Sequence, residues 1–351
     1  MKYITAFLLP LMLSGCVLTE QNTNQGAAAE AIAPEHDEFA CVVSNELGQE
    51  MCETTNEGVV AVIHPAEPIE LNLSEETVPA PIEITDTWDR VRKNFTFHVP
   101  DKQRVISQRN WYLRHPSYMS RVSKRAEPFL YYITEELEKA GMPAELALLP
   151  IVESAFDPFA YSHGRAAGMW QFIPSTGKNY GMKQTWWYDG RRDVIASTAG
   201  AIKYLQRLHK MFDGDWLHAL AAYNSGEGRV MRAIRSNKRK GRPTDFWALD
   251  LPKETRAYVP KLLALADILA NKEEYGFAWP SVNNQPVIEI VDVQSQIDLA
   301  VAAKKAGLTT KELHALNPGY NRWATDPDGP HRLVVPLQVA EDFVAALAET
   351  D

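Results

Sequence analysis

The sequence has few cysteines and lacks the short motifs of the common cofactor and metal enzymes. Only three of its 351 residues are cysteine. It has no H-E-x-x-H zinc motif, no G-x-x-x-x-G-K-[ST] phosphate loop, no G-x-G-x-x-G dinucleotide fingerprint and no G-x-S-x-G nucleophile elbow. We therefore expect no cofactor and no metal, so any catalysis has to come from ordinary side chains.

The sequence also lacks an excess of positive charge. Its 36 Lys and Arg residues stand against 45 Asp and Glu residues, which gives a formal net charge of −9. This balance argues against nucleic acid as a partner, because binding to phosphates needs clustered Lys and Arg. The one basic cluster, Lys238–Arg242, is interpreted as a solvated loop, with weak attraction to an anionic polymer as the functional alternative. The length suggests about two domains.

The apolar run near the start, Ile4–Leu13, is too short to span a bilayer and has the length of a signal-peptide core. It ends in Leu13-Ser14-Gly15-Cys16, which resembles a bacterial lipobox. The resemblance implies that residues 1–15 are a signal peptide and that Cys16 becomes a lipid-modified N-terminus. Because Val17 follows instead of Asp, it also implies the periplasmic face of the outer membrane. The alternative is an ordinary secreted protein cut nearby.

Residues 16–85 are expected to form a tether and N-terminal segment. Gln21–Pro34 shows no periodicity, and Pro65–Pro81 is rich in Pro and Glu. The two other cysteines, Cys41 and Cys52, lie in this segment. In an oxidising compartment an even pair favours a disulfide over a metal site, and two free thiols are the alternative.

Residues 86–280 have a helical pattern. Apolar residues recur at three- and four-residue spacing, and no stretch alternates with period two. Three helices are expected to begin at the caps Asp86, Asp193 and Asp215, and a fourth is expected to begin at Ser123. A further helix leads into Glu153, and the last covers Thr255–Asn271.

Glu153 ends the apolar run of Leu146, Leu148, Leu149, Ile151 and Val152. A buried, unpaired carboxylate costs several kcal/mol or takes up a proton instead, so Glu153 is a candidate acid. The alternative is a partly exposed carboxylate at a helix end. The residues that follow are small and polar, as in many binding loops. Further on, Gln171 lies between Trp170 and Phe172, an arrangement that suits a sugar ring.

The stretch from Glu153 to Phe172 reads ESAFDPFAYSHGRAAGMWQF, and Ala222–Gly226 reads AYNSG. These motifs, in this order and at this spacing, resemble the catalytic module of the soluble-lytic-transglycosylase (SLT) family. The resemblance implies that residues 86–280 form a mainly α-helical, lysozyme-like lobe whose substrate is the glycan strand of peptidoglycan.

The same resemblance implies residue roles. Glu153 is the single catalytic carboxylate, and the substrate-binding residues are Ser162, Met169, Gln171, Tyr223, Asn224 and, in the RAYV segment at 256–259, Tyr258. Trp170 and Phe172 are either core or groove lining. The other polar residues are expected to be structural: Asp157 forms a turn, Asp189, Arg192 and Asp193 provide a helix cap and ion pairs, and His163 has no required role.

A single carboxylate separates the implied reaction from ordinary glycoside hydrolysis, which uses two. Protonated Glu153 would donate to the oxygen between MurNAc and GlcNAc and then take the proton of the MurNAc C6 hydroxyl. Attack of that hydroxyl on C1 closes a 1,6-anhydro ring, and burial has to raise the pKa of Glu153 for the first step. Two alternatives stay open: a lysozyme-like hydrolase of the same bond, and a catalytically inactive peptidoglycan-binding lipoprotein.

Residues 281–351 predict the order strand, helix, helix, strand, with strands over 286–292 and 332–335 and helices around 299–303 and over 309–316. This order is similar to a small α+β LysM-type module. The module is degenerate, because Gln294–Ile297 stands where that family has Gly-Asp-Thr-Leu, and it resembles more the segment after the catalytic domain in a membrane-bound branch of the transglycosylases. It is expected either to bind glycan or to cap the catalytic lobe. The expected partners are peptidoglycan glycan strands and outer-membrane lipid through the anchor.

Overall fold

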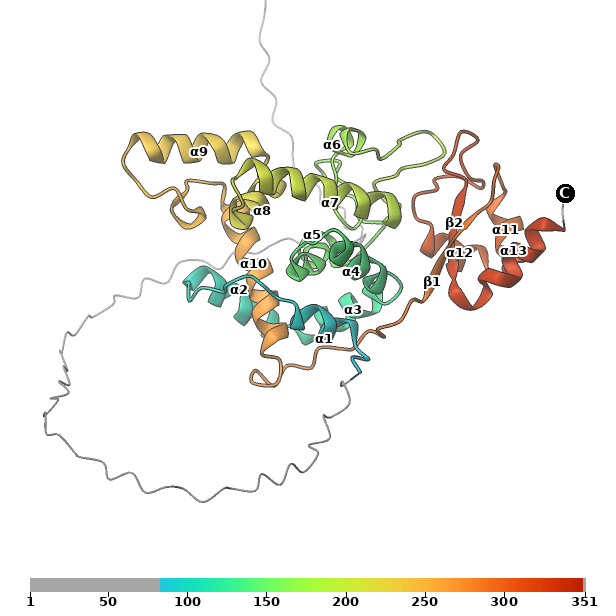
Figure 1. The fold of residues 1–351 in the computed structure, drawn as a ribbon, viewed down its shortest axis with the longest axis horizontal. Coiled ribbons are helices and arrows are strands. Elements are labelled where there is room, and N and C mark those ends of the chain that lie inside the picture. Colours follow the sequence, from blue (N-terminus) through green and yellow to red (C-terminus); the bar gives the residue numbers. More distant parts are fainter. Residues whose placement is uncertain (1–82, 350–351) are drawn as a thin grey trace, which may run out of the picture. The chain divides into compact units, whose positions relative to one another are not determined.

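The computed structural model describes residues 83–349, which are mainly helical and carry one two-stranded sheet (Figure 1). The predicted class, mainly α with a small α+β part at the C-terminal end, is confirmed. The predicted signal peptide, Cys16, the pair Cys41 and Cys52, and the tether up to residue 82 lie outside the described residues. Within residues 83–349, no helix combines the length and the apolar character that crossing a membrane requires.

Four helices open the described part: α1 (Thr87–Lys93), α2 (Gln103–Leu113), α3 (Pro116–Ala126) and α4 (Leu130–Lys139). Asp86 caps α1 as predicted, because its carboxylate accepts a hydrogen bond of 3.0 Å from the Trp88 N–H. The predicted helix start at Ser123 is wrong, since Ser123 is buried inside α3. The following Pro128 has no N–H to continue the helical ladder, so α4 begins only at Leu130.

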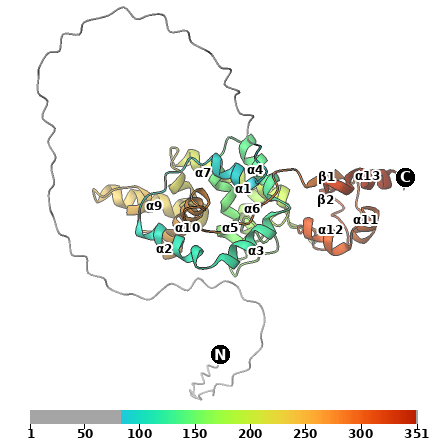
Figure 2. The same ribbon diagram turned by 90° about the horizontal axis from the view of Figure 1, so that it is seen from below.

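The central helix of the large lobe is α10 (Lys253–Ala270), which packs against α2 and α8 (Trp216–Ser225) and lies in the middle of the lobe in Figure 2. Almost every residue between Tyr258 and Leu269 is buried. The helix begins two residues before the predicted start at Thr255, directly after Pro252.

Three further helices belong to this lobe: α6 (Pro174–Asn179), α7 (Val194–Met211) and α9 (Glu227–Arg239). The predicted caps of α7 and α8 are confirmed. The Asp193 carboxylate accepts a hydrogen bond from the Ala196 N–H at 2.7 Å, and the Asp215 carboxylate accepts one from the His218 N–H at 2.9 Å. Such caps satisfy N–H groups that the first helical turn leaves without partners.

The apolar run before Glu153 forms two short elements, a 3-10 turn (Ala144–Leu148) and α5 (Leu149–Ser154). All residues from Ala144 to Ile151 are buried. Within the turn, the fully buried Glu145 carboxylate accepts hydrogen bonds from the N–H groups of Thr96 and Phe97, between α1 and α2. One end of α5 is therefore fixed in the core, and Glu153 lies at the other.

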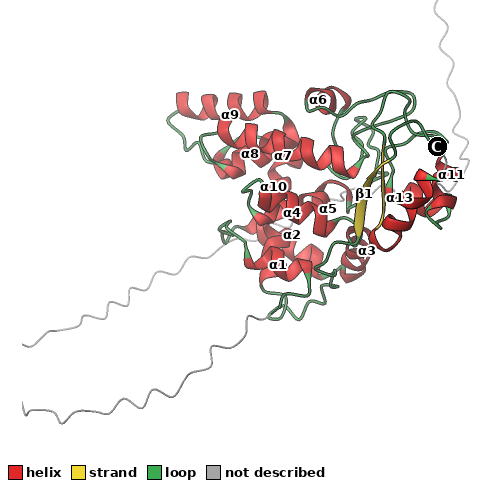
Figure 3. Cartoon of the chain, turned by 45° about the vertical axis from the view of Figure 1, so that its right-hand side comes forward, coloured by secondary structure: helices red, strands yellow, loops and turns green. Residues whose placement is uncertain are grey.

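The C-terminal lobe contains β1 (Ile288–Asp292), α11 (Leu299–Lys305), α12 (Thr310–Leu316), β2 (Arg332–Pro336) and α13 (Ala340–Ala348). The two strands are antiparallel, with Ile290 opposite Val334. Figure 3 labels the first of them, β1, in yellow. The predicted order strand, helix, helix, strand is present. The closing helix α13 was not predicted, and its buried Phe343 completes the small core of this lobe.

The loop before α7 belongs to both hydrophobic cores. Tyr188 lies before α7 in sequence, yet it packs among the buried residues of the C-terminal lobe, with its ring 5.3 Å from that of Tyr320. The Asp189 N–H donates to the Gly319 carbonyl at 2.8 Å, and Arg332 of β2 forms an ion pair with Asp193 at 3.0 Å. The predicted domain limits, 86–280 and 281–351, stay a prediction.

Candidate active site

Glu153 lies at the end of α5, immediately before an unusual turn. Ala155 and Phe156 both have positive φ, at 52° and 58°, a conformation that non-glycine residues adopt rarely. The turn is held by the buried Phe156 ring and by the Ser154 hydroxyl, which donates to the Met169 carbonyl at 3.0 Å. Strain of this kind persists only where the surroundings over-determine it, and here it ends the helix directly after the carboxylate.

Glu153 is half-buried, and burial raises the pKa of its carboxyl group to about 8. The hydrogen bond that the Tyr258 hydroxyl donates to Glu153 lowers this pKa, the negative charge of Glu254 raises it, and the positive charge of Lys261 lowers it. Desolvation is the largest of these effects, because the charged carboxylate loses water contacts that its neighbours replace only in part. Glu153 therefore carries its proton at neutral pH.

Two tyrosine hydroxyls lie in the electrostatic field of Glu153. Burial raises the pKa of both Tyr223 and Tyr258 well above the usual value, and the negative charge of Glu153 adds to the effect at each. Both phenols thus stay protonated and act as hydrogen-bond donors. The Tyr223 hydroxyl donates to the Trp170 carbonyl at 2.8 Å, while the Tyr258 hydroxyl reaches the carboxylate itself.

Asn224 and Glu254 connect the end of α8 to the start of α10. The Asn224 side-chain oxygen accepts a hydrogen bond of 2.8 Å from Thr255, and its amide donates to Glu254 at 3.4 Å. Sequence reasoning missed Glu254, although its charge acts on Glu153. The only sequence signal was its position next to the predicted helix start at Thr255.

Ser162 and Gln171 hold the loop that follows Glu153. The Ser162 hydroxyl accepts a hydrogen bond of 3.0 Å from the Ala166 N–H, and the Gln171 amide donates to the Gly168 carbonyl at 2.8 Å. Among the described residues, neither side chain forms a hydrogen bond with Glu153. Met169 is buried and lies next to the turn, since its carbonyl receives the Ser154 hydroxyl.

The aromatic residues around Gln171 belong to the core. Trp170 is fully buried, with its indole N–H donating to Thr198 at 3.1 Å, and Phe172 is also buried. Trp170 and Phe172 are therefore core residues and not groove lining, and they do not contact a sugar on either side of Gln171. The exposed rings of this loop are instead Phe159 and Tyr161, which sequence reasoning did not single out.

Four residues predicted to be structural make contacts of that kind, with one change of partner: Asp157, Asp189, Arg192 and Asp193. The Asp157 carboxylate accepts from the Phe159 N–H at 2.9 Å, as expected of a turn. Asp189 pairs with Arg191 at 2.7 Å and not with Arg192, which donates instead to Asn321 at 2.9 Å. The sequence could not separate two adjacent arginines, because the direction of each side chain depends on the loop.

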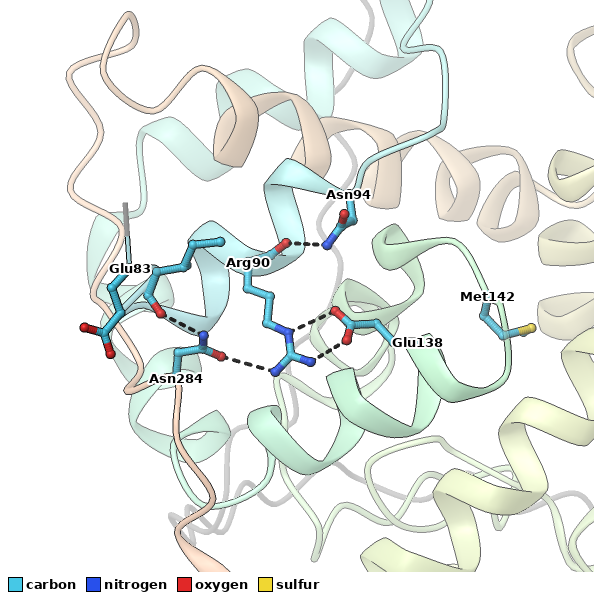
Figure 4. A pocket seen from close by; sticks show the side chains of 7 residues that line it. Glu83, Arg90, Asn94, Glu138, Met142 and Asn284 are labelled. Atoms are coloured by element: carbon cyan, nitrogen blue, oxygen red, sulfur yellow. Dashed lines mark hydrogen bonds and ion pairs between the residues drawn. The ribbon is translucent and has the colours of Figure 1, made fainter. Parts of the chain in front are cut away.

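One pocket of the described residues, of about 790 Å³, contains none of the predicted site residues. Figure 4 shows its centre, where the Arg90 guanidinium donates to Glu138 of α4 and, at 3.4 Å, to Asn284 after α10. The Asn284 amide donates in turn to the Ile84 carbonyl at 2.8 Å. These bonds fasten the chain that leaves α10, so we interpret the pocket as structural. Within residues 83–349, no group of three or more His, Cys, Asp or Glu side chains is placed to hold a metal ion.

Sequence comparison assigns the class of this helical lobe, in which the Tyr258 hydroxyl donates a hydrogen bond to Glu153. Residues 131–246 match the family described as Transglycosylase SLT domain, and residues 287–351 match the LysM-like domain of lytic transglycosylase MltD. The chain belongs to the SLT transglycosylase family, as the motifs around Glu153 and Tyr223 predicted.

Two known proteins are similar to the chain over more than half of its length. Membrane-bound lytic murein transglycosylase D of Escherichia coli (strain K12) is 48% identical over 263 residues, which cover 75% of this chain and 58% of that protein. A putative tributyltin chloride resistance protein of Alteromonas sp. (strain M-1) is 42% identical over 189 residues, which cover 53% of this chain and 89% of that protein. The chain thus spans a little over half the length of the transglycosylase D that it matches.

Proposed function

We propose that the protein is a peptidoglycan lytic transglycosylase that cleaves the β-1,4 bond between MurNAc and GlcNAc and leaves 1,6-anhydro-MurNAc ends. The observation that carries this proposal is the raised pKa of Glu153, about 8, because a single carboxyl group that is protonated at neutral pH can act as the acid. Family membership and the 48% identity to a lytic murein transglycosylase support the substrate class.

The proposed reaction uses Glu153 twice. The protonated carboxyl group donates its proton to the glycosidic oxygen, so the bond from that oxygen to C1 of MurNAc breaks and positive charge develops on the sugar ring. The carboxylate that results removes the proton of the C6 hydroxyl of the same MurNAc. The C6 oxygen then bonds to C1, Glu153 is protonated again, and no water is consumed.

The neighbours of Glu153 suit supporting roles in this reaction. Tyr258 donates to Glu153 and stabilises the carboxylate after the first proton transfer. Tyr223 and Asn224 are expected to line the groove beside the acid, together with Met169. Ser162 and Gln171, whose polar groups hold the loop in the described structure, are proposed to contact the substrate along this loop.

A reaction in water enriched in oxygen-18 tests the proposal directly. Transglycosylation is expected to release muropeptides that carry no label and are lighter than the hydrolysed product by one water. Mass spectrometry of the fragments released from purified sacculi measures both properties, and lysozyme treated in the same way provides the labelled reference. Incorporation of the label at the new sugar end would assign the protein to the hydrolases.

The hydrolase alternative is kept because of Glu254. Its negative charge acts on Glu153, and ordinary glycosidases use a second carboxylate to activate water or to attack the sugar. Against this role, Glu254 is exposed and already accepts a hydrogen bond from Asn224. The oxygen-18 label distinguishes transglycosylation from hydrolysis whatever the roles of Glu153 and Glu254 are.

The activity is expected to fall on the alkaline side of pH 8. Because Glu153 has to start protonated and its pKa is about 8, kcat/KM should decrease about tenfold per pH unit above that value. Initial rates of anhydro-product release from pH 5 to pH 10 measure the profile, with circular dichroism at each pH as the control for folding. A decrease that begins near the ordinary glutamate value of 4.5 would contradict the assignment.

We also propose that the protein acts at a membrane of the cell envelope, on the periplasmic face of the outer membrane, through lipid attached to Cys16. The relative with 48% identity is named as membrane-bound, which supports membrane association. Metabolic labelling with a radioactive fatty acid, compared between the natural chain and Cys16→Ala, tests the anchor.

A further inference from the structure

Three tryptophans form a cluster on the surface of the described residues. Trp186 and Trp187 lie in the loop between α6 and α7, and Trp323 lies between α12 and β2. The centroid of the Trp323 ring is 5.7 Å from that of Trp186 and 5.2 Å from that of Trp187, and the Trp186 and Trp187 rings are 4.8 Å apart. We call Trp186, Trp187 and Trp323 the tryptophan cluster.

Two rings of the cluster are far more exposed than the core tryptophans, while the third, Trp187, is partly buried. Trp186 is 54% exposed and Trp323 is 61% exposed, whereas Trp88 and Trp170 are fully buried. Single exposed apolar residues are common, but contiguous large apolar side chains at a surface are typical of a binding site. Tryptophan is well suited to such a site, since it combines a large apolar face with one N–H donor.

Hydrogen bonds hold the cluster in place before any ligand arrives. The Thr185 hydroxyl accepts from the N–H groups of Trp187 and Tyr188 at 3.2 and 3.0 Å, and it donates to Asp326 at 2.6 Å. The Asn321 N–H donates to the Trp187 carbonyl at 2.7 Å. The loop of the helical lobe is thus fixed on the loop of the C-terminal lobe, and a rigid surface loses little conformational freedom on binding.

Arg322 adds a polar group to the apolar cluster. Its guanidinium carbon lies 3.9 Å from the centroid of the Trp186 ring. Within residues 83–349 the Arg322 side chain has no ion pair and no hydrogen bond, so its N–H donors remain available to a ligand. Exposed aromatic rings with an adjacent donor are complementary to a sugar, because C–H groups cover the faces of the sugar ring and hydroxyl and N-acetyl oxygens surround it.

We propose that the tryptophan cluster and Arg322 bind the N-acetylated glycan strand at a place separate from Glu153. The tryptophan rings pack against the apolar faces of the sugar rings, and Arg322 donates to their oxygens. The inference rests on the proposed function, which supplies a β-1,4-linked glycan as the ligand. It also gives the C-terminal lobe a definite role, because Trp323 and Arg322 come from that lobe while Trp186 and Trp187 come from the other.

Nuclear magnetic resonance of the indole N–H groups tests the proposal at the site itself. The full chain carries Glu153→Gln to prevent cleavage, is labelled with nitrogen-15, and is titrated with the pentasaccharide of β-1,4-linked GlcNAc. The indole signals of Trp186 and Trp323, assigned by Trp186→Phe and Trp323→Phe, are expected to shift and saturate. The proposal is overturned if the indole signals of Trp186 and Trp323 stay unchanged while other signals of the protein shift to saturation. This conclusion holds even if the chain that retains Glu153 produces anhydro ends.

The affinity of variants provides the second measurement. Removing two stacking rings with Trp186→Ala and Trp323→Ala together is expected to weaken retention on sacculi about tenfold. Trp111→Ala is the matched control, since Trp111 is 40% exposed but stacks on His115 of its own lobe, and retention should change less than twofold. Equal retention of the double variant and the natural chain would refute a glycan site. A concentration-dependent dimer that the double variant abolishes would assign the surface to self-association instead.

Discussion

Replacement of Glu153 by Gln is expected to lower the rate of anhydro-product release by about 10³-fold or more. General acid–base catalysis by one positioned group contributes about 10²–10⁴-fold, and in the proposed reaction Glu153 acts first as the acid and then as the base. An amide has neither function at neutral pH. The measurement is the initial rate on purified sacculi, followed by mass spectrometry of the anhydro muropeptides.

Glu254→Gln is the matched control, because it removes a neighbouring carboxylate of the same length. Its charge raises the pKa of Glu153, so its loss should move the alkaline decrease in rate to lower pH and change the rate at neutral pH less than about tenfold. Equal and complete loss of activity in both variants would favour a two-carboxylate hydrolase. Full activity of Glu153→Gln would remove Glu153 from the mechanism.

The folding of Glu153→Gln can be checked through the same pKa. The folded protein holds the Glu153 proton up to about pH 8, whereas the unfolded chain releases it near 4.5. The folded state therefore binds more protons between these values, and stability decreases as the pH rises through them. The variant lacks this penalty, so it should be at least as stable as the natural protein above pH 8.

The second large effect is expected for Asp193→Ala, which should lower the free energy of unfolding by about 3 kcal/mol. The nearly buried Asp193 carboxylate caps α7, accepts a hydrogen bond of 2.7 Å from Tyr188 and pairs with Arg332 of β2 at 3.0 Å. The substitution removes the cap and leaves the Arg332 charge without its partner. Urea denaturation followed by circular dichroism measures the change.

Asp193→Asn separates the cap from the charge, since its side-chain oxygen can still accept a hydrogen bond from the Ala196 N–H. It should therefore cost about 1 kcal/mol less than Asp193→Ala, the usual contribution of a cap. A loss below about 0.5 kcal/mol for Asp193→Ala would mean that neither the cap nor the ion pair stabilises the junction between the lobes.

The parts of the fold that depend on neighbours in sequence were predictable. Asp86, Asp193 and Asp215 begin helices because each carboxylate reaches an N–H group only two or three residues ahead. The break between α3 and α4 and the closing helix α13 were missed. The first depends on one proline within an otherwise periodic pattern, and the second covers a core that exists only once the sheet has formed.

The candidate site was predictable in part, from sequence neighbours for Glu153 and from the family resemblance for Tyr258. The apolar run before Glu153 already indicated a carboxylate with an altered pKa, and the resemblance to the SLT family pointed to Tyr258, which is 105 positions later in the chain. Glu254 carried no such signal, because its effect on Glu153 depends on how α10 packs. The burial of Trp170 and Phe172 and the exposure of Trp186 were equally invisible, since a sequence does not distinguish a core ring from a surface ring.

The junction at Asp189 and Asp193 limits what a shortened chain can reveal. Ending the protein at Pro280 would leave the Asp189 N–H without its acceptor at Gly319 and Asp193 without its ion pair to Arg332. It would also remove the apolar partners of Tyr188. All three contacts lie just before the start of α7. Such a truncation is therefore expected to destabilise the helical lobe that remains. Residues 83–349 lie within one compact unit, so the contribution of either lobe to the proposed glycan binding has to be measured by single substitutions in the intact molecule.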